Sequence, residues 1–113
     1  MDTIQTIKQN NGATLNSNLS PVTLKTGYQV SKRDLLAVDA STLSMDMLEM
    51  VKRQQQPKRG EYIGVWIEAG KAYIDISKRI ASRKAALQAG RDYNQISIWD
   101  WKKQKAIYCK DGE

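Results

Sequence analysis

Residues 61–109 read EYIGVWIEAGKAYIDISKRIASRKAALQAGRDYNQISIWDWKKQKAIYC, and this stretch decides the fold. It begins with two β-rich runs separated by Glu68–Lys71, a segment whose glycine is typical of a tight hairpin turn. Ser82 then provides an N-cap for a helix that extends to about Tyr93. Two shorter β-rich runs follow, the second at 106–109. The pattern predicts a hairpin, a helix and a second hairpin.

Gly90 falls on the same side of the predicted helix as Ala86 and Leu87, which is the side we expect to be buried. A glycine inside a helix costs about 1 kcal/mol relative to alanine. We therefore expect the backbone at Gly90 to pack closely against the sheet.

The preceding residues predict further elements of the same domain. Residues 22–30 and 34–39 predict two short strands with a turn between them, and Ser44 begins a helix that Pro57 ends. The strand at 61–68 is apolar on both faces, which is typical of a central strand covered on both sides.

Residues 1–20 are rich in Asn, Thr, Ser and Gln and show no hydrophobic periodicity. We expect them to form a flexible tail and residues 21–113 to form a single domain. The predicted fold class is α+β, with one small mixed or antiparallel sheet and two helices packed against it.

Composition limits the class of protein. The apolar fraction of 41% and the charged fraction of 27% are typical of a soluble globular chain. No run reaches the roughly 18 apolar residues that cross a bilayer, and the N-terminus lacks a signal-peptide pattern. With one cysteine, Cys109, the chain cannot form an internal disulfide. We therefore expect a cytoplasmic protein.

The chain contains no histidine. This excludes a Ser-His-Asp triad, a Cys-His pair and every histidine-containing zinc site. Cys109 alone cannot form a cysteine-only metal site, and its predicted strand position favours a structural thiol. We predict neither a metal nor a cofactor.

The net charge of +6 is concentrated in the second half of the chain. Residues 1–57 contain six Lys and Arg against five Asp and Glu, whereas residues 58–113 contain twelve against seven. Positive charge of this kind attracts phosphate backbones or acidic protein surfaces.

One candidate binding site is a basic set on the predicted helix, its entry and the last turn. If these elements face the same way, their cations and the amides near Ser82 would bind phosphates. The structural alternative is a solvated helix face and a lysine-rich hairpin that protects an edge strand. The set comprises Lys78, Arg79, Arg83, Lys84, Arg91, Lys102 and Lys103, with Trp101 beside the two lysines.

Aromatic residues are interleaved with these cations, a combination on which single-stranded nucleic acid stacks. Trp101, next to Lys102 and Lys103 in the predicted turn, is the ring that we expect to be exposed. Except for Tyr73, which could also be open, the other rings are expected to pair across strands or fill the core. They are Tyr62, Trp66, Trp99 and Tyr108.

Three aspartates, Asp39, Asp75 and Asp100, lie at or near predicted strands, where a catalytic or magnesium-binding acid could be held. No common spacing links them, and no Gly-rich phosphate loop accompanies them. We expect Asp75 to pair with a nearby Lys or Arg or to cap a turn, and we predict that the chain is not an enzyme.

Three stretches, TGYQVS (Thr26–Ser31), YIGVWIEAGKAYIDIS (Tyr62–Ser77) and NQISIWDWKKQKAIY (Asn94–Tyr108), resemble small accessory proteins of phages and other bacterial mobile elements. The resemblance covers about residues 24–108 and transfers no catalytic residue. It implies a cytoplasmic role in a bacterial host. Small proteins of mobile elements often bind and block a host factor, as anti-CRISPR and anti-restriction proteins do.

Together these observations predict a non-catalytic binding protein that inhibits a host defence nuclease by direct contact with a host protein or nucleoprotein complex. The alternative is a nucleic-acid-binding accessory protein that uses the basic set with Trp101. The last hairpin offers an edge strand, so both a monomer and a homodimer are compatible with the sequence.

Overall fold

The structure is a computed structural model that describes residues 2–110. The order of its helices and strands differs from the expected order mainly in the first third of the chain. The elements are α1 (Thr3–Asn10), β1 (Gly12–Leu15), β2 (Pro21–Val22), β3 (Tyr28–Asp39), the short 3-10 helix η1 (Ala40–Thr42), α2 (Met45–Gln55), β4 (Glu61–Glu68), β5 (Lys71–Ile80), α3 (Arg83–Asp92), β6 (Ser97–Asp100) and β7 (Lys105–Tyr108).

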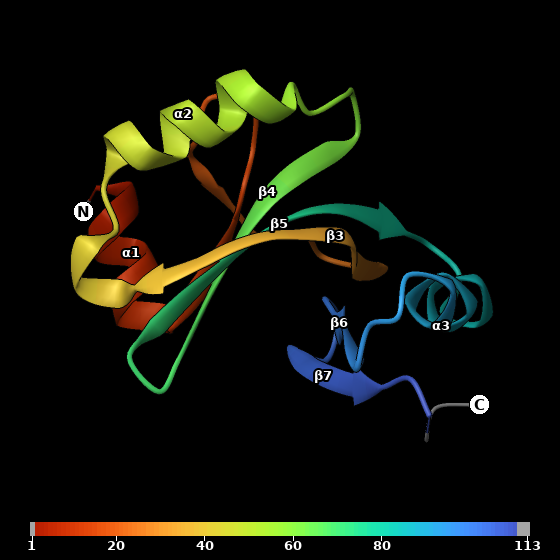
Figure 1. Cartoon of the computed structure of the whole chain (residues 1–113). Helices are drawn as coiled ribbons and strands as arrows, with labels where there is room; N and C mark the ends of the chain where they lie inside the picture. The colour runs from red at the N-terminus through yellow and green to blue at the C-terminus, as the bar shows by residue number, and fades with distance from the viewer. Residues whose placement is uncertain (1, 111–113) are drawn as a thin grey trace.

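All seven of these strands join one antiparallel sheet in the order β2-β1-β4-β5-β3-β6-β7. The sheet curls, and the long strand β3 runs across the molecule from the α3 side to the α1 and α2 side (Figure 1). The α+β class is therefore confirmed. The expectation of a small sheet with two helices is wrong, because residues 2–110 form seven strands and three α-helices.

The N-terminal segment is part of the fold, so the prediction of a flexible tail is wrong for residues 2–20. A capping box starts α1, since Gln5 N–H donates to Asp2 Oδ1 at 2.8 Å and Asp2 N–H donates to Gln5 Oε1 at 3.1 Å. Ile7 and Leu15 are both fully buried, and β1 pairs with β4. The sequence did not indicate Ile7 and Leu15 as core residues, because the segment around them is mostly polar.

The turn expected at residues 31–34 does not form. β3 is continuous, and its ladder with β5 instead contains two irregularities, between Ser31 and Arg33 and between Asp34 and Leu36. A β-bulge inserts an extra residue without reversing the chain. The polar run SKRD therefore marks irregular pairing rather than a turn.

The helix and hairpin predictions downstream are confirmed. Ser44 Oγ accepts from Met47 N–H at the start of α2, and Ser82 Oγ accepts from Ala85 N–H at the start of α3, both at 3.2 Å. A Cβ added to Gly90 would lie 2.7 Å from Cys109 Sγ. Gly90 thus has the close contact that its unfavourable helix propensity led us to expect.

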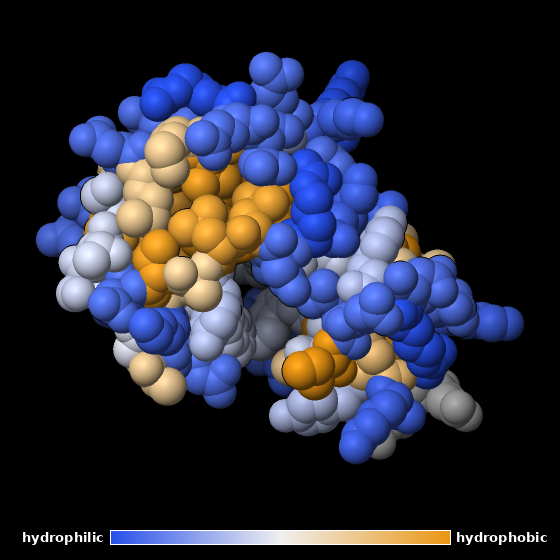
Figure 2. All heavy atoms as spheres, in the orientation of Figure 1, coloured by the Kyte–Doolittle hydropathy of each residue, from blue (hydrophilic) through white to orange (hydrophobic). Residues whose placement is uncertain are grey.

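The three helices pack against the same face of the sheet and form two hydrophobic clusters. The larger one joins α1 and α2 to the sheet through Ile7, Leu48 and Ile74. The smaller one joins α3 to it through Leu87 and Val30, with Ile98 and Cys109 from the C-terminal part. The margin of the larger cluster shows as hydrophobic surface between α2 and β3 (Figure 2).

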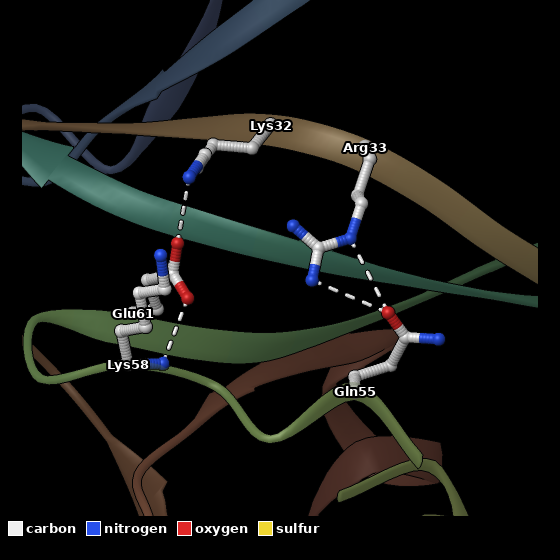
Figure 3. Close-up of polar contacts among 5 residues, drawn as sticks. All are labelled: Lys32, Arg33, Gln55, Lys58 and Glu61. Carbon is white, nitrogen blue, oxygen red and sulfur yellow. Dashed lines mark hydrogen bonds and ion pairs between the residues drawn. The ribbon is translucent and has the colours of Figure 1, made fainter.

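Polar contacts bridge β3 to neighbouring segments on the helix-bearing face (Figure 3). Lys32 Nζ lies 2.7 Å from Glu61 Oε2, and the Arg33 guanidinium donates to Gln55 Oε1 at 3.2 and 3.3 Å. Glu61 Oε1 also accepts from Lys58 N–H at 2.8 Å. Hydrogen bonding to Lys32 lowers the pKa of Glu61, so this carboxylate stays ionised in the contact.

We expect Ile7→Ala to lower the free energy of unfolding by about 2–5 kcal/mol, because it removes a fully buried side chain and leaves a cavity. Ile96→Ala is the matched control, since Ile96 is 79% exposed and its replacement should cost less than about 0.5 kcal/mol. Urea denaturation of both variants measures the difference. Equal stabilities would show that α1 contributes no core.

Candidate binding face of the sheet

The second face of the sheet carries no helix, because the buried side chains of α1, α2 and α3 all belong to clusters on the other face. Strand register shows which residues share this second face: Trp66 pairs with Tyr73, Gly64 with Asp75, and Asp34 with Asp75. The molecular surface is hollowed between the β4–β5 and β6–β7 hairpins (Figure 2). We call the part of the second face that carries Asp34, Ala37, Tyr62, Trp66, Tyr73 and Asp75 the open face; farther along β5, Ser77 of the same face is buried.

Two aromatic side chains on the open face are directly paired and accessible. Trp66 is 50% exposed and Tyr73 is 44% exposed. The expectation that this strand is covered on both sides is wrong: β4 is internal in the sheet, but a helix covers only the face that carries Ile63 and Val65. The sequence indicated Tyr73 as a possible open ring, but not Trp66.

Two carboxylates lie beside this aromatic pair on the open face. Asp34 and Asp75 are register partners on β3 and β5, and the Asp75 side chain leans over Gly64, where an added Cβ would collide with Asp75 Oδ1. Asp75 Oδ1 is buried without a hydrogen-bond partner. Gly64 is therefore the residue that leaves room for this carboxylate.

Burial and, second to it, the negative charge of Asp34 raise the pKa of Asp75 to about 6, although hydrogen bonds from Ser31 and the Gly64 backbone act to lower it. The expected pairing of Asp75 with a cation is wrong, since the ion pairs within residues 2–110 are Lys32–Glu61 and Lys71–Asp39. The sequence pattern placed Asp75 on the polar side of β5 but did not reveal that its register partner is another aspartate.

The other two candidate acids have structural partners. Asp39 Oδ1 lies 2.8 Å from Lys71 Nζ at the end of the β4–β5 hairpin, and this contact lowers the pKa of Asp39. Asp100 is buried, and its Oδ1 accepts from Lys103 N–H at 3.1 Å. The part of the chain that the structure describes holds no group of three acidic, cysteine or histidine side chains suited to a metal ion.

Trp101 is buried, which corrects the expectation that its ring would be exposed for stacking. It is only 6% exposed, and its indole Nε1 donates to Gln29 Oε1 at 3.0 Å. Gln29 in turn donates to Ser77 Oγ at 3.0 Å, so β3, β5 and the last turn share one buried chain of hydrogen bonds. Trp101 is a structural residue and is removed from the predicted stacking surface.

The predicted basic set is divided between the two faces of the sheet. Lys78 and Arg79 are neighbours on β5 and therefore point to opposite faces. Lys78 lies 5.8 Å from the centre of the Tyr93 ring on the helix-bearing side. On the other side, Arg79 donates to Thr26 O at 2.8 Å and to Thr26 Oγ1 at 3.0 Å.

The remaining cations lie on α3 and the last turn. Arg83 and Lys84 are exposed at the start of α3, and Lys102 and Lys103 are exposed in the β6–β7 turn. Arg91 donates to Cys109 O at 3.1 Å. Gly27 links Arg79 to this turn, because its carbonyl accepts from Trp101 N–H and the Arg79 guanidinium lies against its Cα.

A pocket of about 430 Å³ lies between the α2–β4 connection and the segment after β1. Its lining includes the cations Lys52, Lys58 and Arg59, together with Asn16 and Glu61. No sequence pattern indicates this pocket, since its residues come from 15–17 and 52–63 and meet only in the folded chain.

No helix within residues 2–110 has the length and apolar character needed to cross a membrane. No family model, curated protein or solved structure matches the chain.

We expect Asp75→Asn to stabilise the protein at pH 7.5 by about 1–3 kcal/mol. The pKa of Asp75 is raised from 3.8 to about 6, so the folded state binds more protons than the unfolded state between these values. The free energy of unfolding therefore falls as pH rises through this window and stays low above it.

Chemical denaturation of the wild type and Asp75→Asn from pH 4 to pH 7.5 measures this effect. The stability difference should be near zero at pH 4 and fully developed at pH 7.5. Glu49→Gln, at an exposed position of α2, is the control and should show no such trend. A constant difference across the range would contradict the raised pKa.

Proposed function

We propose that this chain is a non-catalytic binding protein that contacts its partner through the open face of the sheet. The observation that supports this is the uncovered Trp66–Tyr73 pair on two internal strands of the sheet, close to the β4–β5 turn. Tryptophan and tyrosine supply large contact areas and are enriched among the residues that dominate interface energies. An uncovered sheet face with paired aromatic rings therefore favours a binding role.

The partner that we propose is a host defence nuclease, free or within a nucleoprotein complex, in the cytoplasm of a bacterium. The basis for this partner is the resemblance of Thr26–Ser31, Tyr62–Ser77 and Asn94–Tyr108 to accessory proteins of phages and mobile elements. The second of these stretches contains the aromatic pair. The net charge of +6 disfavours imitation of DNA, which would need an acidic surface.

We expect the double variant Trp66→Ala/Tyr73→Ala to lose the protein partner that the tagged wild type captures from bacterial lysate treated with nuclease. Tyr108→Ala is the matched control: Tyr108 is 56% exposed on the edge strand β7, so its loss should leave capture unchanged. Capture is quantified by mass spectrometry at matched protein stability. Undiminished capture by the double variant would contradict the open-face assignment.

The inhibitory role has a separate test in cells. Expression of the wild type should raise the plating efficiency of a phage that the host's restriction or CRISPR system normally blocks, and the double variant should not. No change in plating against any of these systems, despite a captured partner, would contradict inhibition while leaving the binding role intact.

A second candidate function is direct nucleic-acid binding. It is favoured by Arg83, Lys84, Lys102 and Lys103, which are exposed and whose side chains form no hydrogen bond or ion pair within residues 2–110. Unpaired surface cations of this kind can neutralise phosphates and release counterions.

For this second function, the affinity for a single-stranded or duplex DNA oligonucleotide should fall steeply with salt. Arg83→Ala/Lys84→Ala should weaken binding and reduce the slope of log affinity against log salt by about 1–2, since each lost phosphate contact contributes about 0.7–0.9. Fluorescence anisotropy measures both quantities, with Lys8→Ala on α1 as the control. A salt-independent or absent interaction would remove this candidate.

A further inference from the structure

We propose that the open face binds an arginine side chain of the partner protein, with the guanidinium stacked on Trp66 and Tyr73 and paired with Asp34 and Asp75. The inference rests on the proposed binding function and adds the chemistry that the partner must present. Three observations support this inference: the aromatic pair is accessible, the two carboxylates have no cation partner within residues 2–110, and the aromatic pair and the carboxylate pair are next to each other along β5.

The arrangement follows from the strand register. Tyr73 and Asp75 are two residues apart on β5, so their side chains leave the same face about 7 Å apart along the strand. Trp66 lies opposite Tyr73, and Asp34 lies opposite Asp75. Two aromatic rings thus stand next to two carboxylates, within the reach of one long side chain.

No cation pairs with either carboxylate of this site within the described chain. Ser31 Oγ lies 3.4 Å from Asp34 Oδ1, and hydrogen bonds from Ser31 and the Gly64 backbone act on Asp75, although Asp75 Oδ1 itself has no hydrogen-bond partner. Two cations share this face of β5, each four residues from Asp75: Lys71 pairs with Asp39, and Arg79 is held by Thr26. Asp34 and Asp75 therefore form a locally acidic spot on the open face of a protein whose net charge is +6.

Arginine fits this combination better than lysine. A guanidinium is planar, stacks on aromatic faces and donates two parallel hydrogen bonds to a carboxylate, whereas an ammonium is a compact and strongly hydrated charge. Contact with a ring adds a cation–π attraction that grows as water is excluded. Burial raises the pKa of Asp75, which shows that its ionised form is poorly solvated and would gain from a cation.

The probe is the peptide Ac-Gly-Arg-Gly-NH₂, titrated at millimolar concentration into the full chain at pH 7.5 and observed by NMR. The three tryptophans give separate indole signals that report on different places: Trp66 on the open face, Trp99 on β6 and the buried Trp101. The comparison peptide replaces arginine with citrulline, which has the same shape and no charge. A lysine peptide tests the preference for a guanidinium.

We expect the arginine peptide to shift the Trp66 indole signal saturably, while the Trp101 signal stays unchanged. Asp34→Asn and Asp75→Asn should each weaken binding by about tenfold, the effect of removing a charge-assisted hydrogen bond. Asp46→Asn, at the start of α2 on the opposite face, should bind like the wild type. The lysine peptide should bind more weakly than the arginine peptide.

Equal shifts with the citrulline peptide, or no shift at Trp66, would overturn the arginine site. If the Trp66→Ala/Tyr73→Ala variant nevertheless loses its protein partner while Asp34→Asn and Asp75→Asn retain it, the open face binds by another chemistry and the proposed function stands. Loss of peptide binding together with undiminished partner capture by the aromatic variant would remove both proposals.

Discussion

The ladder between β3 and β5 is the interaction on which the rest of the structure depends. It runs from Tyr28 opposite Ile80 to Asp39 opposite Lys71, and among the strand pairings of residues 2–110 it is the one that spans both hydrophobic clusters. Leu36 of β3 packs against the larger cluster, whereas Val30 belongs to the smaller one. Neither cluster can be completed without this strand, which therefore joins what would otherwise be two small cores.

The same ladder creates the conditions for binding. Its register sets Asp34 opposite Asp75, and the adjoining pairing of β4 with β5 sets Trp66 opposite Tyr73. A largely buried carboxylate beside a second carboxylate reduces stability, as do exposed aromatic rings, so a sheet built for stability alone would avoid them. Their presence side by side on the one face without a helix favours a functional explanation over a structural one.

Local signals allowed the sequence to predict the downstream half of the fold. Ser44 and Ser82 are N-caps whose effects act within one turn, and Gly70 lies in a hairpin turn that joins adjacent strands. The rest depended on long-range pairing. The N-terminal strand joins β4 some fifty residues away, and Trp101 is buried through Gln29, 72 positions earlier in the chain. Such long-range partners leave no local pattern in the sequence. This is why the sequence predicted a flexible tail at the N-terminus and an exposed Trp101, and did not indicate the open face.

The position of Cys109 makes its thiol a natural probe of local opening of the fold. It is the only thiol in the chain, it lies 3% exposed in the smaller cluster beneath Gly90, and burial raises its pKa. A thiol-modifying reagent reaches this buried sulfur only when the packing around Cys109 opens. Its rate of modification therefore measures how often the smaller core opens, independently of the larger one, without any added label.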